Sequence, residues 1–143
     1  MKDKIIQKLN NHLRENTVMH TTYWYPLVEI KSGIPAAAYY ITDIYKDNQI
    51  NLIERVLYKC GIRTVNTIQP EFFEYHENED ILEILYEKDE CGYCFPYLCE
   101  IFIWDFSKEW LIYISHEQTI SFTGKKISET AKNIIPEKYL IDY

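Results

Sequence analysis

The stretch from Cys99 to Gly124 constrains the fold of this chain more than any other part of the sequence. It reads CEIFIWDFSKEWLIYISHEQTISFTG, and its β-branched and aromatic residues are interrupted twice by short polar groups, DFSK and HEQ. Apolar runs separated by turn-forming residues are typical of consecutive antiparallel strands. The sequence therefore predicts a three-stranded meander towards the carboxyl end of the chain.

The three predicted strands differ in how they distribute apolar residues. Leu98–Trp104 has apolar residues on both faces, which is typical of a central strand buried from both sides. In Trp110–His116 one face is more apolar than the other. Thr119–Thr123 alternates, so we expect a half-exposed strand near a sheet edge, with Ile120 and Phe122 facing the core. Its outward-facing residues would then be Thr119, Ser121 and Thr123.

Two helices are predicted in the first half of the chain. Residues 4–14 place apolar side chains at helical spacing, namely Ile5, Ile6, Leu9 and Leu13, which indicates an amphipathic helix that caps one face of the sheet. A second helix is predicted to start at Asn48 as its capping residue and to run to about Cys60. Gly61 then stands at the position where a helix commonly stops.

Three strands are predicted around these helices, and one more helix after the meander. Thr22–Ile30 is rich in β-forming residues, but Pro26 removes an amide and favours an edge strand or a bulge. Ala36–Tyr45 could begin a helix after Pro35, but we interpret it as a strand because of its Tyr, Ile and Thr content. Ile62–Ile68 is a further strand. The last helix stops before Pro136 and buries one apolar face, made of Ile127, Ala131, Ile134 and Ile135.

These elements predict an α+β fold, with about three helices on an antiparallel or mixed sheet. A length of 143 residues suits a single domain over residues 1–143. We expect a cytoplasmic protein, because we find neither a signal peptide nor an apolar stretch long enough to cross a membrane. In that compartment the four cysteines are expected to be free thiols.

The net acidity of the chain is concentrated in one segment, residues 71–90. This segment holds nine acids and one base, a balance of −8, whereas the whole chain carries −7 and the remainder therefore sums to +1. Eight apolar or aromatic residues are interleaved with the acids, too many for a disordered acidic tail. We therefore expect the segment to be folded.

A folded acidic segment has two interpretations. It is either a solvated face that aids solubility or a docking surface, whose field speeds the approach of a basic partner while its aromatic rings anchor the contact. Such a surface repels the phosphates of DNA and RNA. The alternative that this chain imitates nucleic acid as a decoy remains. The predicted partner-binding residues are Glu74, Tyr75, Glu77, Glu79, Asp80, Glu83, Tyr86 and Glu87.

A metal-binding or hydrolytic protein is the alternative interpretation. Cys91 and Cys94 form a C-x-x-C pair, which Cys99 and His76 could complete as a tetrahedral site. The second pair that commonly completes a zinc site is missing, and the segments around C-x-x-C do not suit a thioredoxin-like motif. We therefore predict no metal and no cofactor.

The turn at His116 and Glu117 is the second place where chemistry could arise. Ser115 and Asp105 supply the residue types of a catalytic triad, but adjacent residues of a strand point to opposite faces. The turn histidine is therefore expected to make local hydrogen bonds only. The sequence also lacks the glycine-rich motifs of nucleotide-binding loops, so we predict that the chain is not an enzyme.

The carboxyl-terminal stretch resembles the ends of small bacterial proteins related to the immunity proteins of polymorphic or contact-dependent toxin systems. The residues that carry the resemblance are Asp105-Phe-Ser-Lys-Glu-Trp110 and the following LIYISHEQTISFTGKKI, about a fifth of the chain. The resemblance implies a cytoplasmic α+β protein that binds and blocks a cognate toxin, often a basic nuclease. The acidic segment is consistent with such a partner. A structural subunit that self-associates through its aromatic residues is a further possibility.

Overall fold

The computed structural model describes residues 35–69, 74–86, 101–107, 109–115 and 118–141. The expected helix at 4–14 and the expected strand at 22–30 lie outside them. The described residues form a six-stranded sheet with the order β1-β6-β5-β4-β2-β3, and every strand pair is antiparallel. The strands are β1 (Ala36–Tyr40), β2 (Thr64–Gln69), β3 (Glu74–Asp80), β4 (Ile101–Trp104), β5 (Leu111–Ile114) and β6 (Thr119–Thr123).

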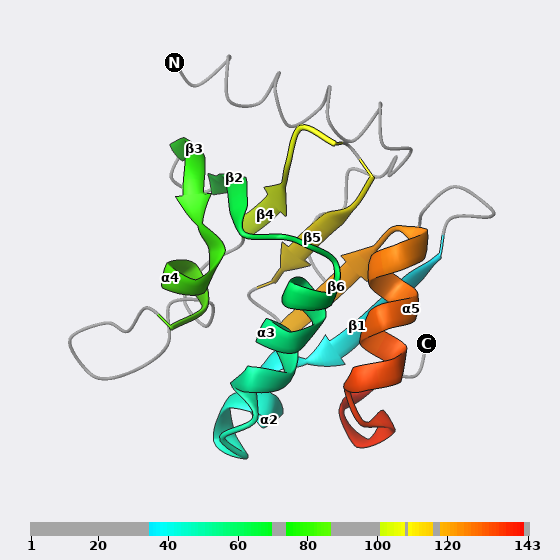
Figure 1. The fold of residues 1–143 in the computed structure, drawn as a ribbon. Coiled ribbons are helices and arrows are strands. Elements are labelled where there is room, and N and C mark those ends of the chain that lie inside the picture. Colours follow the sequence, from blue (N-terminus) through cyan, green and yellow to red (C-terminus); the bar gives the residue numbers. More distant parts are fainter. Residues whose placement is uncertain (1–34, 70–73, 87–100, 108, 116–117, 142–143) are drawn as a thin grey trace.

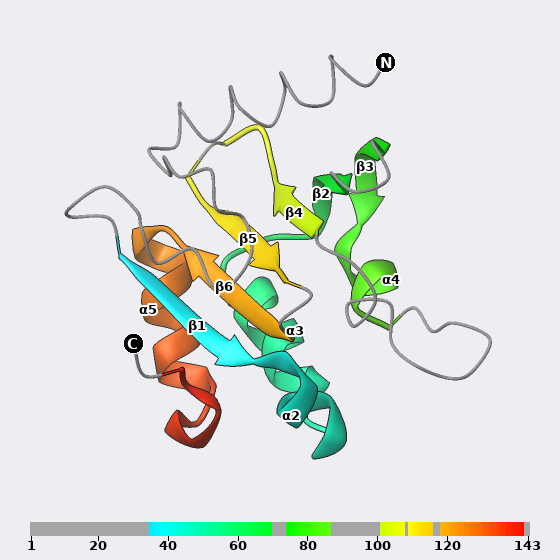
Figure 2. The same ribbon diagram turned by 180° about the vertical axis from the view of Figure 1, so that it is seen from behind.

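The helices confirm the α+β class. They are α2 (Ile41–Lys46), α3 (Ile50–Lys59), α4 (Ile81–Tyr86) and α5 (Lys125–Ile134), followed by the short 3-10 helix η3 (Glu137–Tyr139). All four α-helices contribute to one apolar cluster with the inward residues of the sheet, including Ile103, Ile112 and Phe122. They therefore pack on the same face; α3 and α5 lie in front of the strands in Figure 1 and behind them in Figure 2.

The predicted meander is present as β4-β5-β6. Ile112 of β5 pairs with Ile103 of β4 on one side and with Phe122 of β6 on the other. The prediction that the first of these strands is central is confirmed, since β4 lies between β5 and β2. Its two faces are both buried, and on the face away from the helices Phe102 stacks on Tyr113 with ring centroids 4.6 Å apart.

The prediction that β6 is half-exposed is wrong. The three hydroxyl residues expected to face solvent, Thr119, Ser121 and Thr123, are all buried. β6 pairs with β1 on its outer side, so β1 and not β6 is the edge strand. The Thr119 hydroxyl lies 2.7 Å from that of Ser115 and is satisfied by it, as buried polar groups usually are, whereas the buried hydroxyls of Ser121 and Thr123 have no hydrogen-bond partner within the described residues. The alternation of apolar and hydroxyl-bearing residues along β6 therefore did not predict which side chains are exposed.

The segment Ala36–Tyr45, predicted to be one strand, is divided between two elements. Ala36–Tyr40 forms β1 as expected, but Ile41–Lys46 forms the helix α2, which corrects the second half of the prediction. Ile41 and Ile44 are both fully buried on the helix side of the sheet. Spacing of three residues presents both on one helical face, whereas in a strand they would point to opposite faces.

The boundaries of α3 were predicted correctly at one end only. Asn48 is not the cap: it takes a left-handed conformation with φ of 58°, and the helix begins after Gln49. At the other end Gly61 has φ of 69°, and the amides of Gly61 and Ile62 donate to the carbonyls of Tyr58 and Leu57. This pair of bonds is a Schellman motif, which places glycine in the left-handed position after the helix. Gly61 therefore ends α3 as predicted.

The carboxyl-terminal part of the described chain returns to the edge of the sheet. The predicted last helix is confirmed as α5, which ends at Ile134 before Pro136. After η3, Leu140 forms an antiparallel bridge with Tyr39 of β1, and the Ile141 amide donates to the Ala38 carbonyl over 2.9 Å. Part of the outer edge of β1 is thereby closed by the chain itself.

Candidate functional site

The described part of the acidic segment, residues 74–86, forms the opposite edge of the sheet. Of the predicted docking residues, Glu74 to Asp80 lie on β3, and Glu83 and Tyr86 lie on the helix α4 that follows directly. β3 pairs with β2 on one side, and within the described residues no strand pairs with its other side. Figure 1 shows β3 and α4 together at the margin of the molecule. Glu87 lies outside the described residues.

A bulge interrupts the pairing of β3 with β2. The register shifts between Val65 and Thr67, and Asn78 opposite this point has φ of 58°. The Asn78 amide donates to the side-chain oxygen of buried Asn66 over 3.4 Å. A bulge increases the local twist of a strand and is common at sheet edges. It leaves the side chains of His76, Glu77 and Asn78 exposed to solvent.

Tyr75 attaches this edge to the core. Its ring is partly buried 6.0 Å from the Trp104 ring, and its hydroxyl donates to Glu77 over 2.5 Å. Burial, followed by the Glu77 carboxylate, raises the pKa of the Tyr75 hydroxyl, so the phenol stays neutral. Tyr75 thus contributes to packing as well as to the surface that the sequence predicted.

Asp80 is engaged within the molecule. The Nε and Nη2 groups of Arg63 donate to its two carboxylate oxygens over 2.9 and 3.0 Å. The Leu82 amide donates to the same carboxylate over 2.9 Å, so Asp80 also caps α4. The Arg63 guanidinium, followed by the Leu82 amide, holds the pKa of Asp80 below its usual 3.8. Asp80 is therefore a structural residue of this edge, and charge-reversal tests should leave it in place.

The helix α4 extends the acidic surface towards α3. Ile81 and Leu85 are buried, whereas Glu83 and Tyr86 are exposed. The Tyr86 hydroxyl donates to the Glu54 carboxylate of α3 over 2.8 Å. Burial and, after it, Glu54 raise the pKa of Tyr86 to about 12, which keeps this phenol a neutral donor at physiological pH.

Sequence reasoning missed two members of this surface, Glu54 and Arg63. The Asp80 carboxylate is the main reason that the pKa of Arg63 is raised, and the charges of Glu54 and Glu83 raise it further. Both missed residues lie outside the acidic segment, on α3 and just before β2. Pairing of β2 with β3 brings Arg63 to Asp80, and the hydrogen bond from Tyr86 brings in Glu54, so residue composition along the chain could not identify them.

The candidate metal site is largely outside the described residues, which exclude Cys91, Cys94 and Cys99. His76 lies on the exposed side of β3, where its Nδ1 is 3.8 Å from a Glu79 oxygen. Among the residues that the structure describes, no group of three potential ligands is close enough to hold a metal ion. Cys60, which is among the described residues and follows α3, is a free thiol.

The expected catalytic residues near the last hairpin are only partly described. His116 and Glu117 lie outside the described residues. Ser115 is fully buried, and its hydroxyl is 2.7 Å from that of Thr119. Asp105 accepts hydrogen bonds from the amide and the hydroxyl of Ser107 in the β4–β5 turn. Both side chains therefore serve local structure.

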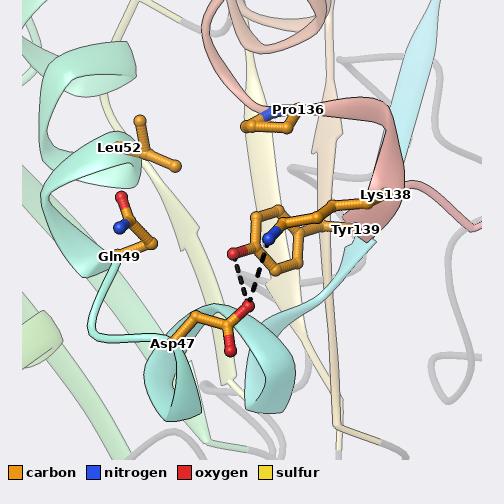
Figure 3. A pocket seen from close by; sticks show the side chains of 6 residues that line it. All are labelled: Asp47, Gln49, Leu52, Pro136, Lys138 and Tyr139. Carbon is orange, nitrogen blue, oxygen red and sulfur yellow. Dashed lines mark hydrogen bonds and ion pairs between the residues drawn. The ribbon is translucent and has the colours of Figure 1, made fainter.

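A surface pocket of about 460 Å³ lies between the end of α2 and the chain after α5 (Figure 3). The Tyr139 hydroxyl donates to an Asp47 oxygen over 2.7 Å, and Lys138 Nζ lies 3.5 Å from the same atom. The bond from Tyr139 is the main reason that the pKa of Asp47 is lowered. These polar groups satisfy one another, so the cluster joins η3 to the α2–α3 connection and presents no unbalanced charge to a ligand. Its other lining residues are Gln49, Leu52 and Pro136.

Comparison with known proteins adds no assignment: no family model, curated protein or solved structure matches this chain. Among the described residues, no helix has the length and apolar character needed to cross a membrane. Among the described residues, the acidic edge formed by β3 and α4 is the surface feature that supports a function.

Proposed function

We propose that this chain is a non-catalytic binding protein of immunity type, which docks its acidic, aromatic edge on a basic protein such as a toxin nuclease and thereby blocks it. In this proposal the protein acts in the cytoplasm, without a cofactor. One observation carries the proposal: Glu77, Glu79 and Glu83 follow one another along the outer edge strand β3 and the helix α4, on the same margin of the sheet.

The charges around this margin support attraction of a cation. Within the described residues β3 and α4 carry five acids, Glu74, Glu77, Glu79, Asp80 and Glu83, and no lysine or arginine, and Glu54 of α3 adds a sixth acid. Asp80 and Arg63 neutralise each other, which leaves five acids, whereas the bases of α3 near them are Arg55 and Lys59. A concentrated field of one sign raises the rate at which an oppositely charged protein associates.

The experiment begins with affinity capture from the native host lysate, washed in steps of increasing salt, to identify the partner. Its association rate with the purified chain is then compared with that of the triple variant Glu77→Lys, Glu79→Lys, Glu83→Lys. The control variant carries Glu109→Lys, Glu129→Lys and Glu137→Lys, three exposed acids elsewhere. Each variant changes the formal charge by six, from −7 to −1, so only the position of the charges differs.

We expect the edge variant to associate at least about ten-fold more slowly than the control variant at low salt, with the difference shrinking as salt rises. Inhibition of the partner's activity should fall in parallel. Equal association rates for the two variants would contradict the proposal, because the acidic edge would then have no special role.

A further inference from the structure

Two exposed tyrosines flank Glu54 where α3 and α4 meet. Tyr58 lies one turn after Glu54 on α3, and residues four apart share one face of a helix. Tyr86 reaches the same carboxylate from α4 through its hydroxyl. With 84% of its surface exposed, Tyr58 is the most exposed large apolar residue in the described chain. The proposed docking surface therefore has an aromatic part that the acidic segment alone does not supply.

The same surface already holds one arginine. Arg63 meets Asp80 through two nearly parallel N–H···O bonds, the geometry in which guanidinium and carboxylate are most specific. The charges of Glu54 and Glu83 reach this guanidinium as well. The carboxylates of Glu54, Asp80 and Glu83 thus create a negative potential in which a guanidinium group is stabilised.

We propose that this junction recognises an arginine side chain of the basic partner in preference to lysine. The guanidinium stacks on the exposed Tyr58 ring and pairs with the Glu54 carboxylate, which Tyr86 holds in place. Arginine is suited to both contacts, since its planar group stacks on aromatic rings and donates in pairs to carboxylates, whereas lysine is a compact and strongly hydrated charge. This inference rests on the proposed function and adds the chemistry that the surface selects.

The arrangement of α3 determines the side from which the arginine approaches. A turn of 3.6 residues places Arg55 and Lys59 round the helix from Tyr58, on the side away from Glu54. Their positive charges repel a cation there. The hydrogen bond from Tyr86 uses one oxygen of Glu54, and a carboxylate can accept further donors. The open approach is therefore from α4, over Glu54 and Glu83.

The test uses two fluorescently labelled peptides of equal charge, nona-arginine and nona-lysine, titrated with the full chain at low salt. We expect the arginine peptide to bind at least about three-fold more tightly, the size of one exposed cation–π contact. Tyr58→Ala should remove most of this preference by weakening the arginine peptide alone. Glu54→Gln and Tyr86→Phe should reduce it in part. Tyr40→Ala, at an exposed tyrosine of the opposite edge strand, is the matched control and should leave it unchanged.

Equal affinity for the two peptides would overturn the arginine inference while leaving the acidic docking proposal intact. The same holds if Tyr58→Ala weakens both peptides equally, since the ring would then act without selectivity. If neither peptide binds, both proposals fail. Thermal unfolding of each variant shows whether it is folded. Because Tyr58 is so exposed, Tyr58→Ala should leave the unfolding midpoint unchanged.

Discussion

The two edges of the sheet are protected in different ways. At one edge, β1 carries three alanines and two tyrosines and is buried at Ala37, Ala38 and Tyr39, and the chain covers part of it through the bridge between Tyr39 and Leu140. At the other edge, β3 carries a bulge and a row of acids, and no described strand covers it. Uncovered strands invite pairing with other chains, and charge together with a bulge discourages it. One edge is thus partly closed by the chain itself, whereas the described part of the other is uncovered and acidic.

This difference has a direct functional meaning. Where the chain itself covers β1, another strand cannot pair without displacing it, whereas in the proposed function the acidic open edge repels other copies of the chain and attracts a basic protein. Solvated acids and a docking surface therefore are compatible explanations of the same residues. Packing at the closed edge and charge at the open edge can be varied independently by substitution.

The largest expected effect is at the closed edge. Tyr39 is 1% exposed, and its ring lies 6.0 Å from the Phe122 ring in an edge-to-face arrangement. Tyr39→Ala should lower the free energy of unfolding by about 3–5 kcal/mol, as for other large buried rings. The matched variant at the open edge, Tyr75→Ala, should cost less because Tyr75 is only partly buried. Urea denaturation measures both, and equal losses would contradict the contrast between the edges.

A smaller loss is expected when the carboxyl-terminal bridge is broken. Ile141→Pro removes the amide that donates to the Ala38 carbonyl and should destabilise the fold by about 1–3 kcal/mol, the cost of an unsatisfied buried acceptor. Hydrogen exchange should also become faster in β1 and remain unchanged in β3. Ile141→Val keeps the amide and is the control, so similar losses in both variants would show that the side chain matters and the bridge does not.

Charge removal at the open edge should change association with little change in stability. Glu77→Val together with Glu79→Val replaces two acids by residues that favour strands, and the group it leaves without its acceptor is the partly buried Tyr75 hydroxyl. We expect self-association at micromolar concentrations, detected by sedimentation velocity. The control, Glu129→Val with Glu137→Val, removes the same charge elsewhere and should remain monomeric to the same extent as the original chain. Identical sedimentation of the two variants would show that the acids do not protect the edge.

The smallest effect is the pH dependence of the pair between Arg63 and Asp80. The folded-state pKa of Asp80 lies below 3.8, so the pair stabilises the fold above about pH 4 and this contribution is lost as the pH falls through the folded pKa. Asp80→Asn removes the charge and keeps a side chain that can cap α4. The thermal midpoints of the two proteins should differ most at neutral pH and converge in acid. A difference that is constant with pH would exclude the charge as its cause.

Much of the fold could be predicted from local patterns. The meander, the helix that ends at Gly61 and the helix that stops before Pro136 were all recognised, because each depends on the order of residues within a short stretch. Where the prediction was wrong, distant residues decided the outcome. Ile41–Lys46 became a helix because Ile41 and Ile44 reach the same core, and β6 is not an edge strand because β1 pairs beside it.

For the candidate site, the sequence by itself determined that the acidity is concentrated in one folded, aromatic segment. The distribution of charged and apolar residues is a property of the sequence and can be identified without the structure. Only the tertiary structure decided that the described part of this segment is an open edge, that Asp80 is bound by Arg63, and that Tyr86 reaches Glu54. The pairing of β2 with β3 brings Arg63 to Asp80, and a hydrogen bond between residues 32 positions apart joins α4 to α3. Neither contact has a local signal in the sequence.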